Sequence, residues 1–238
     1  MRAVSGSKRA AATVRQSLRQ TSPTMTKMLL PWLMLAALTP AAHAQDAEAG
    51  RAKAAMCIGC HGIPGYQNAF PEVHKVPMIS GQAGGYLAAA LQAYRSGERR
   101  HPTMRGIARA LSDADIADLA AFYERDGAAG LQLKSVAARQ PSARVTELLT
   151  QGACASCHGE NLDQPIDPSY PKIAGQHPDY LLVALKAYQV QGGRVVGRDH
   201  PIMNGIVGQF TLAELRMLAD HIGSLPGSLS TVPQSRWR

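Results

Sequence analysis

Apolar side chains recur at the three- and four-residue spacing of an amphipathic helix in two matching segments, 86–94 and 180–188. Pro178 suits the first turn of the second helix, where a backbone N–H has no partner to lose. An Ala-rich stretch over 47–55 predicts another helix ahead of the first cysteine. Since no segment shows the strict apolar–polar alternation of a strand, the pattern predicts an all-α fold.

The last helix of each half of the chain is predicted from the capping pattern at its N-terminus. Ser112 with Asp115, and Thr211 with Glu214, have the spacing of a capping box, in which two residues satisfy each other's backbone N–H groups. Apolar residues at helical spacing follow each box. The glycines predicted to end these helices are Gly127 and Gly223.

One module occurs twice along the chain. Three segments recur in the same order: C-x-x-C-H-G, then P-x-I-x-G-Q, then M-x-G-I. Two copies indicate a tandem domain duplication and not a solenoid. The predicted division is a leader over 1–44, a first domain over 45–130, a linker over 131–143, a second domain over 144–225 and a loose tail over 226–238.

The predicted leader has the organisation of a secretory signal. Lys27 precedes an apolar run over 28–38, and Ala42 and Ala44 supply small residues two apart before a polar stretch. The run is short for a membrane span, so export is the prediction and an uncleaved anchor the alternative. A start at Met25 would give a signal of more ordinary length. We expect the mature chain in the periplasm, without a transmembrane segment; peripheral association with a membrane stays open.

The formal net charge of +8 does not indicate a nucleic-acid-binding protein. Residues 1–44 hold six Lys or Arg and no acidic residue, whereas the rest of the chain has 19 basic against 17 acidic residues. The basic excess therefore belongs to the leader, and the remainder has no surplus suited to binding phosphates.

Each module carries the attachment signature of c-type haem, C-x-x-C-H. Two thiols on one helical turn can reach both vinyl groups of a porphyrin, and the next histidine can then ligate the iron. A zinc site would need four ligands where each copy offers three, and a redox disulfide would leave the histidine unexplained. The sequence predicts two covalently bound haem c groups. Their predicted attachment points are Cys57, Cys60, Cys154 and Cys157, and the predicted iron ligands are His61 and His158.

A methionine in the same place of each copy is the candidate sixth ligand. Met104 and Met203 each come shortly before a capped helix, and methionine ligation raises the potential of a haem that carries electrons. His101 and His200, three residues earlier, could also bind iron, and that alternative stays open.

These motifs resemble those of class I c-type cytochromes, and their tandem arrangement over residues 46–225 is similar to the dihaem cytochrome c4 family. The resemblance implies His/Met ligation of both irons and two haems that face each other across a pseudo-twofold interface. It also implies that the carbonyl groups of Pro77 and Pro171 each accept a hydrogen bond from the proximal histidine. The first copy has three extra residues before Gly81, which should change only a loop.

Two six-coordinate irons leave no open position for a substrate, so we predict an electron carrier without catalytic residues. The expected partners are redox proteins of a respiratory chain. A quinol-oxidising complex or a dehydrogenase would be the donor, and a terminal oxidase or reductase the acceptor. The alternatives are a dihaem enzyme such as a peroxidase, which would need an open haem, and an electron-transfer subunit of a dehydrogenase complex.

Five arginines crowd around Met104 in the sequence. They predict a docking patch for an acidic partner, or else a solvated loop or partners of the haem propionates. These residues are Arg95, Arg99, Arg100, Arg105 and Arg109.

Overall fold

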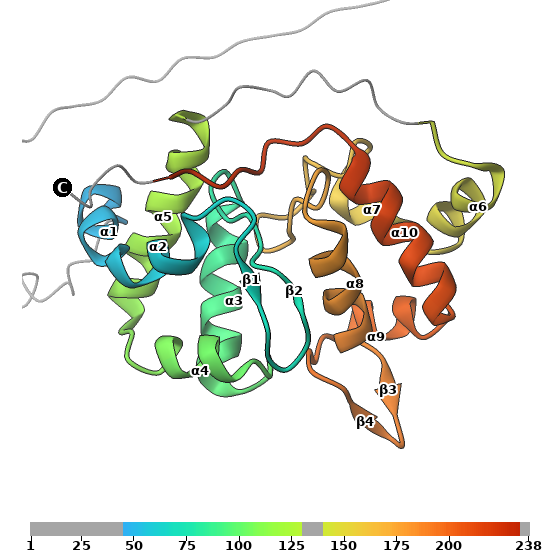
Figure 1. Ribbon diagram of the computed structural model, residues 1–238, viewed down its shortest axis with the longest axis horizontal. Helices are drawn as coiled ribbons and strands as arrows, with labels where there is room; N and C mark the ends of the chain where they lie inside the picture. The colour runs from blue at the N-terminus through green and yellow to red at the C-terminus, as the bar shows by residue number, and fades with distance from the viewer. Residues whose placement is uncertain (1–44, 130–139, 234–238) are drawn as a thin grey trace, which may run out of the picture. The chain divides into compact units, whose positions relative to one another are not determined.

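Helices form nearly all of the regular structure in this computed structural model, which describes residues 45–129 and 140–233 (Figure 1). The helices of the first half are α1 (Ala47–Lys53), α2 (Ala55–His61), α3 (Gly84–Ser96), α4 (Pro102–Ala108) and α5 (Asp113–Ala129). Those of the second half are α6 (Ala143–Gln151), α7 (Cys154–His158), α8 (Pro178–Ala187), α9 (Pro201–Val207) and α10 (Leu212–Ser224). The predicted all-α fold is confirmed, and the same helix order is used twice.

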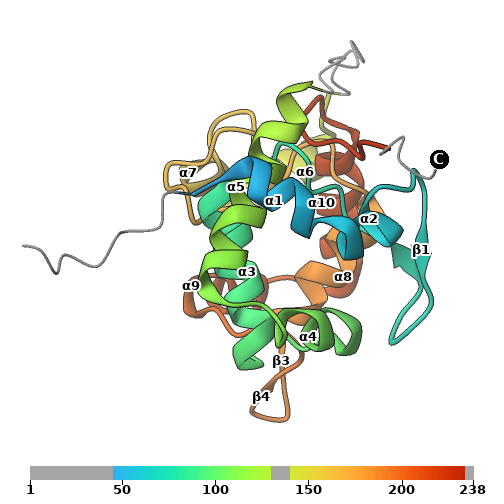
Figure 2. The same cartoon turned by 90° about the vertical axis from the view of Figure 1, so that its left-hand side faces the viewer.

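The first half is built around α5. Helices α1 and α3 both pack against it, and Figure 2 shows α1 crossing α5. The backbone N–H of Asp115 donates to Ser112 Oγ at 3.1 Å, and that of Ser112 donates to Asp115 Oδ2 at 3.0 Å, as the capping-box pattern predicts. Three of the seven buried members of this core are alanines, so the small core supplies limited apolar bulk of its own. Its buried members are Ala47, Ala54, Leu87, Leu119, Ala120, Phe122 and Tyr123.

The second half is built around α10, which packs against α8 and α6. Thr211 and Glu214 form a complete capping box at its start. Larger aliphatic side chains fill this core than fill that of the first half. They include Leu148, Leu181, Leu182, Leu215, Leu218 and Ile222.

The described residues also contain two small antiparallel hairpins. One pairs β1 (Gln67–Asn68) with β2 (His74–Lys75), and the other pairs β3 (Val190–Gln191) with β4 (Arg194–Val195). Strands of two residues are too short to show alternation, which explains why the sequence pattern missed them. Across these same parts of the chain, no helix is both long and apolar enough to span a membrane.

The two halves are joined by a reciprocal set of hydrogen bonds that we call the glutamine clasp. The side chain of Gln176 accepts from Met78 N at 3.0 Å and donates to Met78 O at 2.9 Å. The side chain of Gln82 accepts from Lys172 N at 2.8 Å and donates to Lys172 O at 2.9 Å. Because these residues hold equivalent places in the repeat, one pattern joins the halves in both directions.

Neither glycine that was predicted to end a helix does so. Helix α5 continues past Gly127 to Ala129, and α10 continues past Gly223 to Ser224. A Cβ atom on Gly127 would lie 2.0 Å from the Cα of Gly81, and one on Gly223 would lie 2.7 Å from the carbonyl oxygen of Gln176. Both glycines therefore allow a close approach of two backbone segments, a requirement that local helix signals do not reveal.

The described part of the predicted tail is not loose. After α10 the chain turns back toward the first half, where Ser230 N donates to Ser80 O at 3.0 Å (Figure 1). Ser228 donates from its backbone and its hydroxyl to Asp163, and Leu229 is buried. These contacts lie far from the segment in sequence, so its Pro, Ser and Gly content could not reveal them. Residues 234–238, the leader and most of the predicted linker lie outside the described residues.

We expect Gly127→Ala to lower the free energy of unfolding by about 1–3 kcal/mol, because the new methyl group would collide with the backbone of Gly81. The control is Gly84→Ala, whose methyl group would have the movable carboxylate end of Glu124 as its nearest neighbour. Chemical denaturation of both haem-loaded variants measures the difference. Equal stability of the two variants would contradict the close approach.

Candidate functional site

Helix α2 presents the first C-x-x-C-H motif to the interior of the first half. His61 donates from Nδ1 to the carbonyl oxygen of Pro77 at 2.9 Å; because a carbonyl only accepts, Nδ1 carries the proton and Nε2 keeps its lone pair. Burial lowers the pKa of His61, which favours the neutral ring that a metal requires. The ring is thus held in the tautomer and orientation of a ligand.

Helix α7 repeats this arrangement in the second half. His158 is buried and donates from Nδ1 to the carbonyl oxygen of Pro171 at 2.8 Å. Burial lowers its pKa as well. Both hydrogen bonds that the family resemblance implied are therefore present.

The candidate methionines lie on α4 and α9, two short helices that the sequence did not predict. Each helix starts with a histidine as N-cap and a proline in its first turn. Nδ1 of His101 accepts from Met104 N, and Nδ1 of His200 accepts from Met203 N, each at 3.4 Å. The repeated H-P pair is therefore explained as a helix start that places the methionine one turn later.

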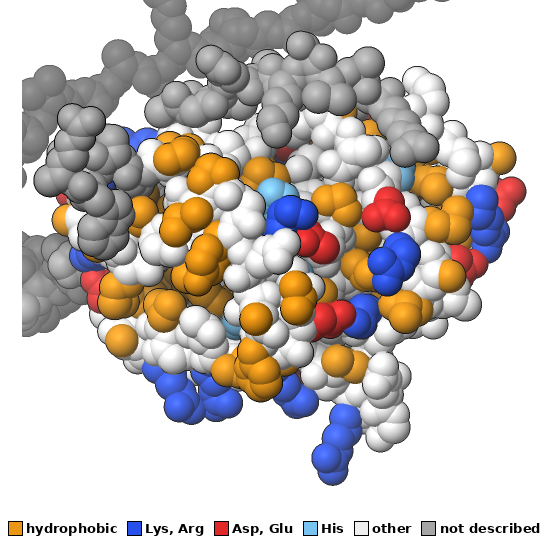
Figure 3. Space-filling model, viewed as in Figure 1, with side chains coloured by type: hydrophobic (Ala, Val, Ile, Leu, Met, Phe, Trp, Pro, Cys, Tyr) orange, Lys and Arg blue, Asp and Glu red, His pale blue; other side chains and the backbone are white. Residues whose placement is uncertain are grey.

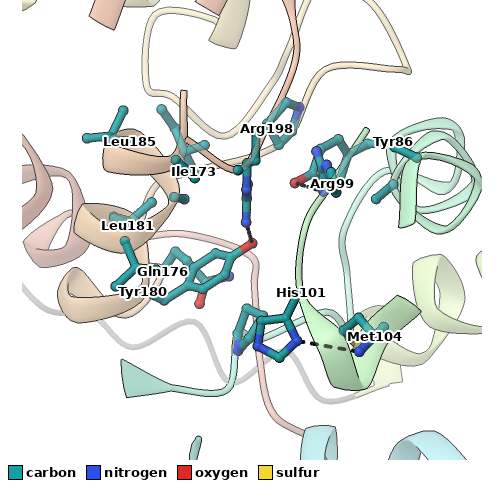
Figure 4. Close-up of a pocket in the computed structure, with 18 of the residues that line it drawn as sticks. Tyr86, Arg99, His101, Met104, Ile173, Gln176, Tyr180, Leu181, Leu185 and Arg198 are labelled. Carbon is teal, nitrogen blue, oxygen red and sulfur yellow. Dashed lines mark hydrogen bonds between the residues drawn. The ribbon is translucent and has the colours of Figure 1, made fainter. Parts of the chain in front are cut away.

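One connected cavity of about 1030 Å³ is lined by both sets of candidate residues. This volume lies at the upper end of the usual range for ligand pockets. Figure 4 shows the part of the cavity between the halves, with Met104 and His101 on one side and Tyr180 and Leu181 on the other. Its lining includes Cys57, Cys60, His61 and Met104 from the first half and Cys154, Cys157, His158 and Met203 from the second.

The environment of the first cysteine in each motif disfavours the reactive thiolate that a redox disulfide needs. All four cysteines are free, and burial raises the pKa of Cys57 and Cys154. A neutral buried thiol is a poor nucleophile for disulfide exchange. Residues 45–129 and 140–233 also contain no group of three or more His, Cys, Asp or Glu that could hold a zinc ion directly.

Known proteins share this twofold arrangement of motifs. A family model described as Cytochrome c matches the chain twice, over residues 47–124 and 142–226. The cytochrome c4 of Stutzerimonas stutzeri is 31% identical over 214 residues, covering 84% of this chain and 100% of that protein. The chain belongs to the dihaem cytochrome c4 family.

Two further relatives extend the comparison. The crystal structure of reduced recombinant cytochrome c4 from Pseudomonas stutzeri aligns with a TM-score of 0.55 and 27% identity, covering 76% of this chain and 100% of that one. A thiosulfate dehydrogenase electron acceptor from Stutzerimonas stutzeri strain A1501 is 31% identical, covering 81% of this chain and 91% of that protein. As a member of the cytochrome c4 family, the chain is a dihaem electron-transfer protein that carries two covalent haem c groups.

Two arginines, half-buried Arg99 and buried Arg198, fit the propionate edge of such groups. Arg99 and Arg198 are backbone partners in an antiparallel bridge between the halves, flanked by a 2.7 Å bond from Arg100 N to Gly197 O. Arg99 donates to the hydroxyl of Tyr86 at 3.2 Å, and Arg198 donates to that of Tyr180 at 3.0 Å. Figure 4 shows both arginines in the cavity between the halves.

Like charges directly opposite each other across a bridge destabilise it, and buried cations need an anion. No carboxylate of the described residues forms a salt bridge with either arginine. Burial alone would raise the pKa of Tyr86, but the positive charges of Arg99 and Arg198 outweigh it and lower that pKa to about 8. The propionate groups of the haems would supply the missing negative charge, so the residues present fit the cofactor.

We expect Met104→His to lower the potential of one haem and leave the other unchanged, because histidine favours oxidised iron more than methionine does. Potentiometric titration followed by visible absorption measures both potentials. Two unchanged potentials, together with a shift on His101→Ala, would assign the sixth ligand to His101 instead.

We expect Arg198→Leu to lower at least one haem potential, because a nearby cation favours the reduced iron. The redox equilibrium should move by about tenfold, which is ~59 mV for a one-electron couple. Arg198→Lys, which keeps the charge, should move it less, and Arg105→Leu, at an exposed position, should leave both potentials unchanged. Equal behaviour of Arg198→Leu and Arg105→Leu would contradict the pairing with propionates.

Proposed function

We propose that this cytochrome is a periplasmic carrier that moves single electrons between proteins of a respiratory chain. The observation that carries the proposal is the matched pair of sites: each half combines a cavity-lining histidine held by a proline carbonyl with a methionine in the equivalent place of the same cavity. When bound, haem supplies the reversible one-electron couple. His61 and Met104 would hold the iron of one haem, and His158 and Met203 that of the other.

The matched sites favour electron transfer over enzymatic turnover of a substrate. An enzyme such as a peroxidase would need one iron with a free position and an acid or base beside it. Both halves instead offer a methionine next to a helix start that fixes its backbone. Saturated iron ligation suits rapid electron exchange, since neither oxidation state requires the site to rearrange.

The donor and acceptor are redox proteins, and two kinds of partner follow from the proposal. A quinol-oxidising complex or a dehydrogenase would deliver electrons, and a terminal oxidase or reductase would accept them. The relative named thiosulfate dehydrogenase electron acceptor supports a dehydrogenase as donor. Export to the periplasm is supported by the signal pattern over residues 1–44 and would place the protein beside such partners.

The arginine cluster predicted from the sequence divides into three parts in the structure. Arg95 pairs with Asp113 and also donates to Leu111 O, and Arg99 lies in the cavity between the halves. The remaining three arginines, Arg100, Arg105 and Arg109, are exposed and form no salt bridge among the described residues. We define them as the arginine patch.

Figure 3 shows Lys and Arg side chains gathered along the lower edge of one face, where Figure 1 draws α4 and the β3–β4 hairpin. Exposed Arg194 on β4 adds a charge from the second half. Since α4 also carries Met104, this edge lies close to one haem site. An acidic partner would be steered to it, because exposed charges change association rates more than affinities.

We expect electron-transfer rates with the physiological partner to fall as salt rises. At 0.1 M salt, the attraction between exposed charges is largely screened beyond about 10 Å. Replacing Arg105 and Arg109 of the arginine patch by Glu should slow transfer at low salt by about tenfold or more without moving either potential, because neither side chain lines the cavity. Arg216→Glu, an exposed charge reversal on α10, is the control. Stopped-flow measurements with purified oxidases, quinol-oxidising complexes and dehydrogenases provide the rates.

Three results would count against this function. Failure of every candidate partner to exchange electrons rapidly would contradict the carrier. Steady peroxide consumption by the reduced protein would favour the enzyme. Rates that change neither with salt nor on the Arg105 and Arg109 substitutions would contradict docking at the arginine patch but not the carrier role.

A further inference from the structure

The glutamine clasp contacts the same peptide groups that hold the proximal histidines. The peptide between Pro77 and Met78 accepts from His61 Nδ1 through its C=O and donates to Gln176 Oε1 through its N–H. A single amide group therefore links a histidine of the first half to a glutamine of the second half. Figure 4 places Gln176 beside Tyr180, on the second-half side of the cavity.

The other half repeats the arrangement with the roles exchanged. The peptide between Pro171 and Lys172 accepts from His158 Nδ1 and donates to Gln82 Oε1. Gln82 and Gln176 are each only 3% exposed, so water cannot easily replace either side chain. Each glutamine oxygen also accepts from the next backbone N–H, of Ala83 or His177 at 3.0 Å, which fixes the amide in this orientation.

We propose that each glutamine sets the redox potential of the haem in the opposite half. Gln176 is a positioning residue for the first haem, and Gln82 is one for the second. The inference rests on the proposed ligation by His61 and His158 and adds a coupling across the interface that neither haem motif contains.

The direction of the effect follows from polarisation along hydrogen bonds. An acceptor on the N–H side of an amide increases the negative charge on its carbonyl oxygen, so hydrogen bonds in series strengthen one another. A stronger acceptor for Nδ1–H makes the imidazole a better electron donor to iron. Because oxidised iron gains most from a better donor, an intact clasp lowers the potential, and its loss raises it.

The crossed arrangement predicts a pattern that local damage would not produce. Gln176→Leu should raise the potential of the first haem, and Gln82→Leu should raise that of the second. The equilibrium constant for electron exchange between the haems should therefore move in opposite directions in the two variants, by up to about tenfold, or ~59 mV for a one-electron couple. The double variant should raise both potentials and bring that equilibrium constant back toward its original value.

The test uses the full haem-loaded protein and measures both potentials by spectroelectrochemistry. Repeating each substitution in the Met104→His background identifies the first haem, whose potential that change should have lowered. Gln92→Leu, at an exposed position on α3, is the matched control and should move neither potential. The hyperfine-shifted NMR signal of the proximal histidine Nδ1–H should shift only in the half opposite the substituted glutamine.

Three outcomes would overturn the crossed coupling. Each variant could move the potential of the haem in its own half, which would indicate local repacking. Both potentials could fall together in each single variant, which would indicate an interface opened to water, since water favours the more highly charged oxidised iron. Both potentials could stay unchanged. If Met104→His itself moves no potential, the proposed ligation fails instead, and that result is separate from these three.

Discussion

The hydrogen bond from the histidine of each C-x-x-C-H motif to a proline carbonyl is the interaction on which the rest of the structure depends. In each half it fixes the ring of the histidine that follows the second cysteine. The P-x-I-x-G-Q segment that supplies this carbonyl also supplies the glutamine that crosses to the other half. One short segment therefore orients a candidate iron ligand and holds the two halves together. A change in its backbone would affect both the ligand and the contact between the halves.

The stability of the first half also depends on the haem site. Its buried cluster is rich in alanine, and the helices around it enclose part of a large cavity. A module of this size gains too little stability from burying such a core, and a covalently held apolar cofactor would provide the missing apolar contacts. The bridge between Arg99 and Arg198 adds an electrostatic requirement, because these two cavity-lining cations lie opposite each other and neither forms a salt bridge with a carboxylate in the part of the chain that the structure describes. Packing and charge thus both favour a chain that closes around its haems.

Features that depend on neighbouring residues could be predicted from the sequence, and features that depend on distant ones could not. The haem motifs, the helices over 84–96 and 178–187 and both capping boxes were visible because each is encoded within a few residues. The close approach of Gly127 to Gly81 and the return of the chain after α10 join segments far apart in sequence. The repeated glutamines were visible as a motif, but their partners lie in the other half. The repeated H-P pair was also visible, and its capping role became clear only from the start of α4 and α9.

The segment that the two copies do not share makes the two sites unequal. The three extra residues of the first copy were expected to change only a loop, yet the region between its haem motif and Gly81 contains the β1–β2 hairpin, which contacts α8 of the second half. Lys75 N donates to Asp179 there, and buried His74 packs its ring 6.1 Å from that of Tyr180. The second copy has its hairpin after α8 instead, with exposed Val190. Since the clasp treats both halves alike, we expect a difference between the two haem environments to come from such unshared parts. The first hairpin contacts α8 of the second half, whereas the second accepts a hydrogen bond from Arg100 of the first half through Val195 O.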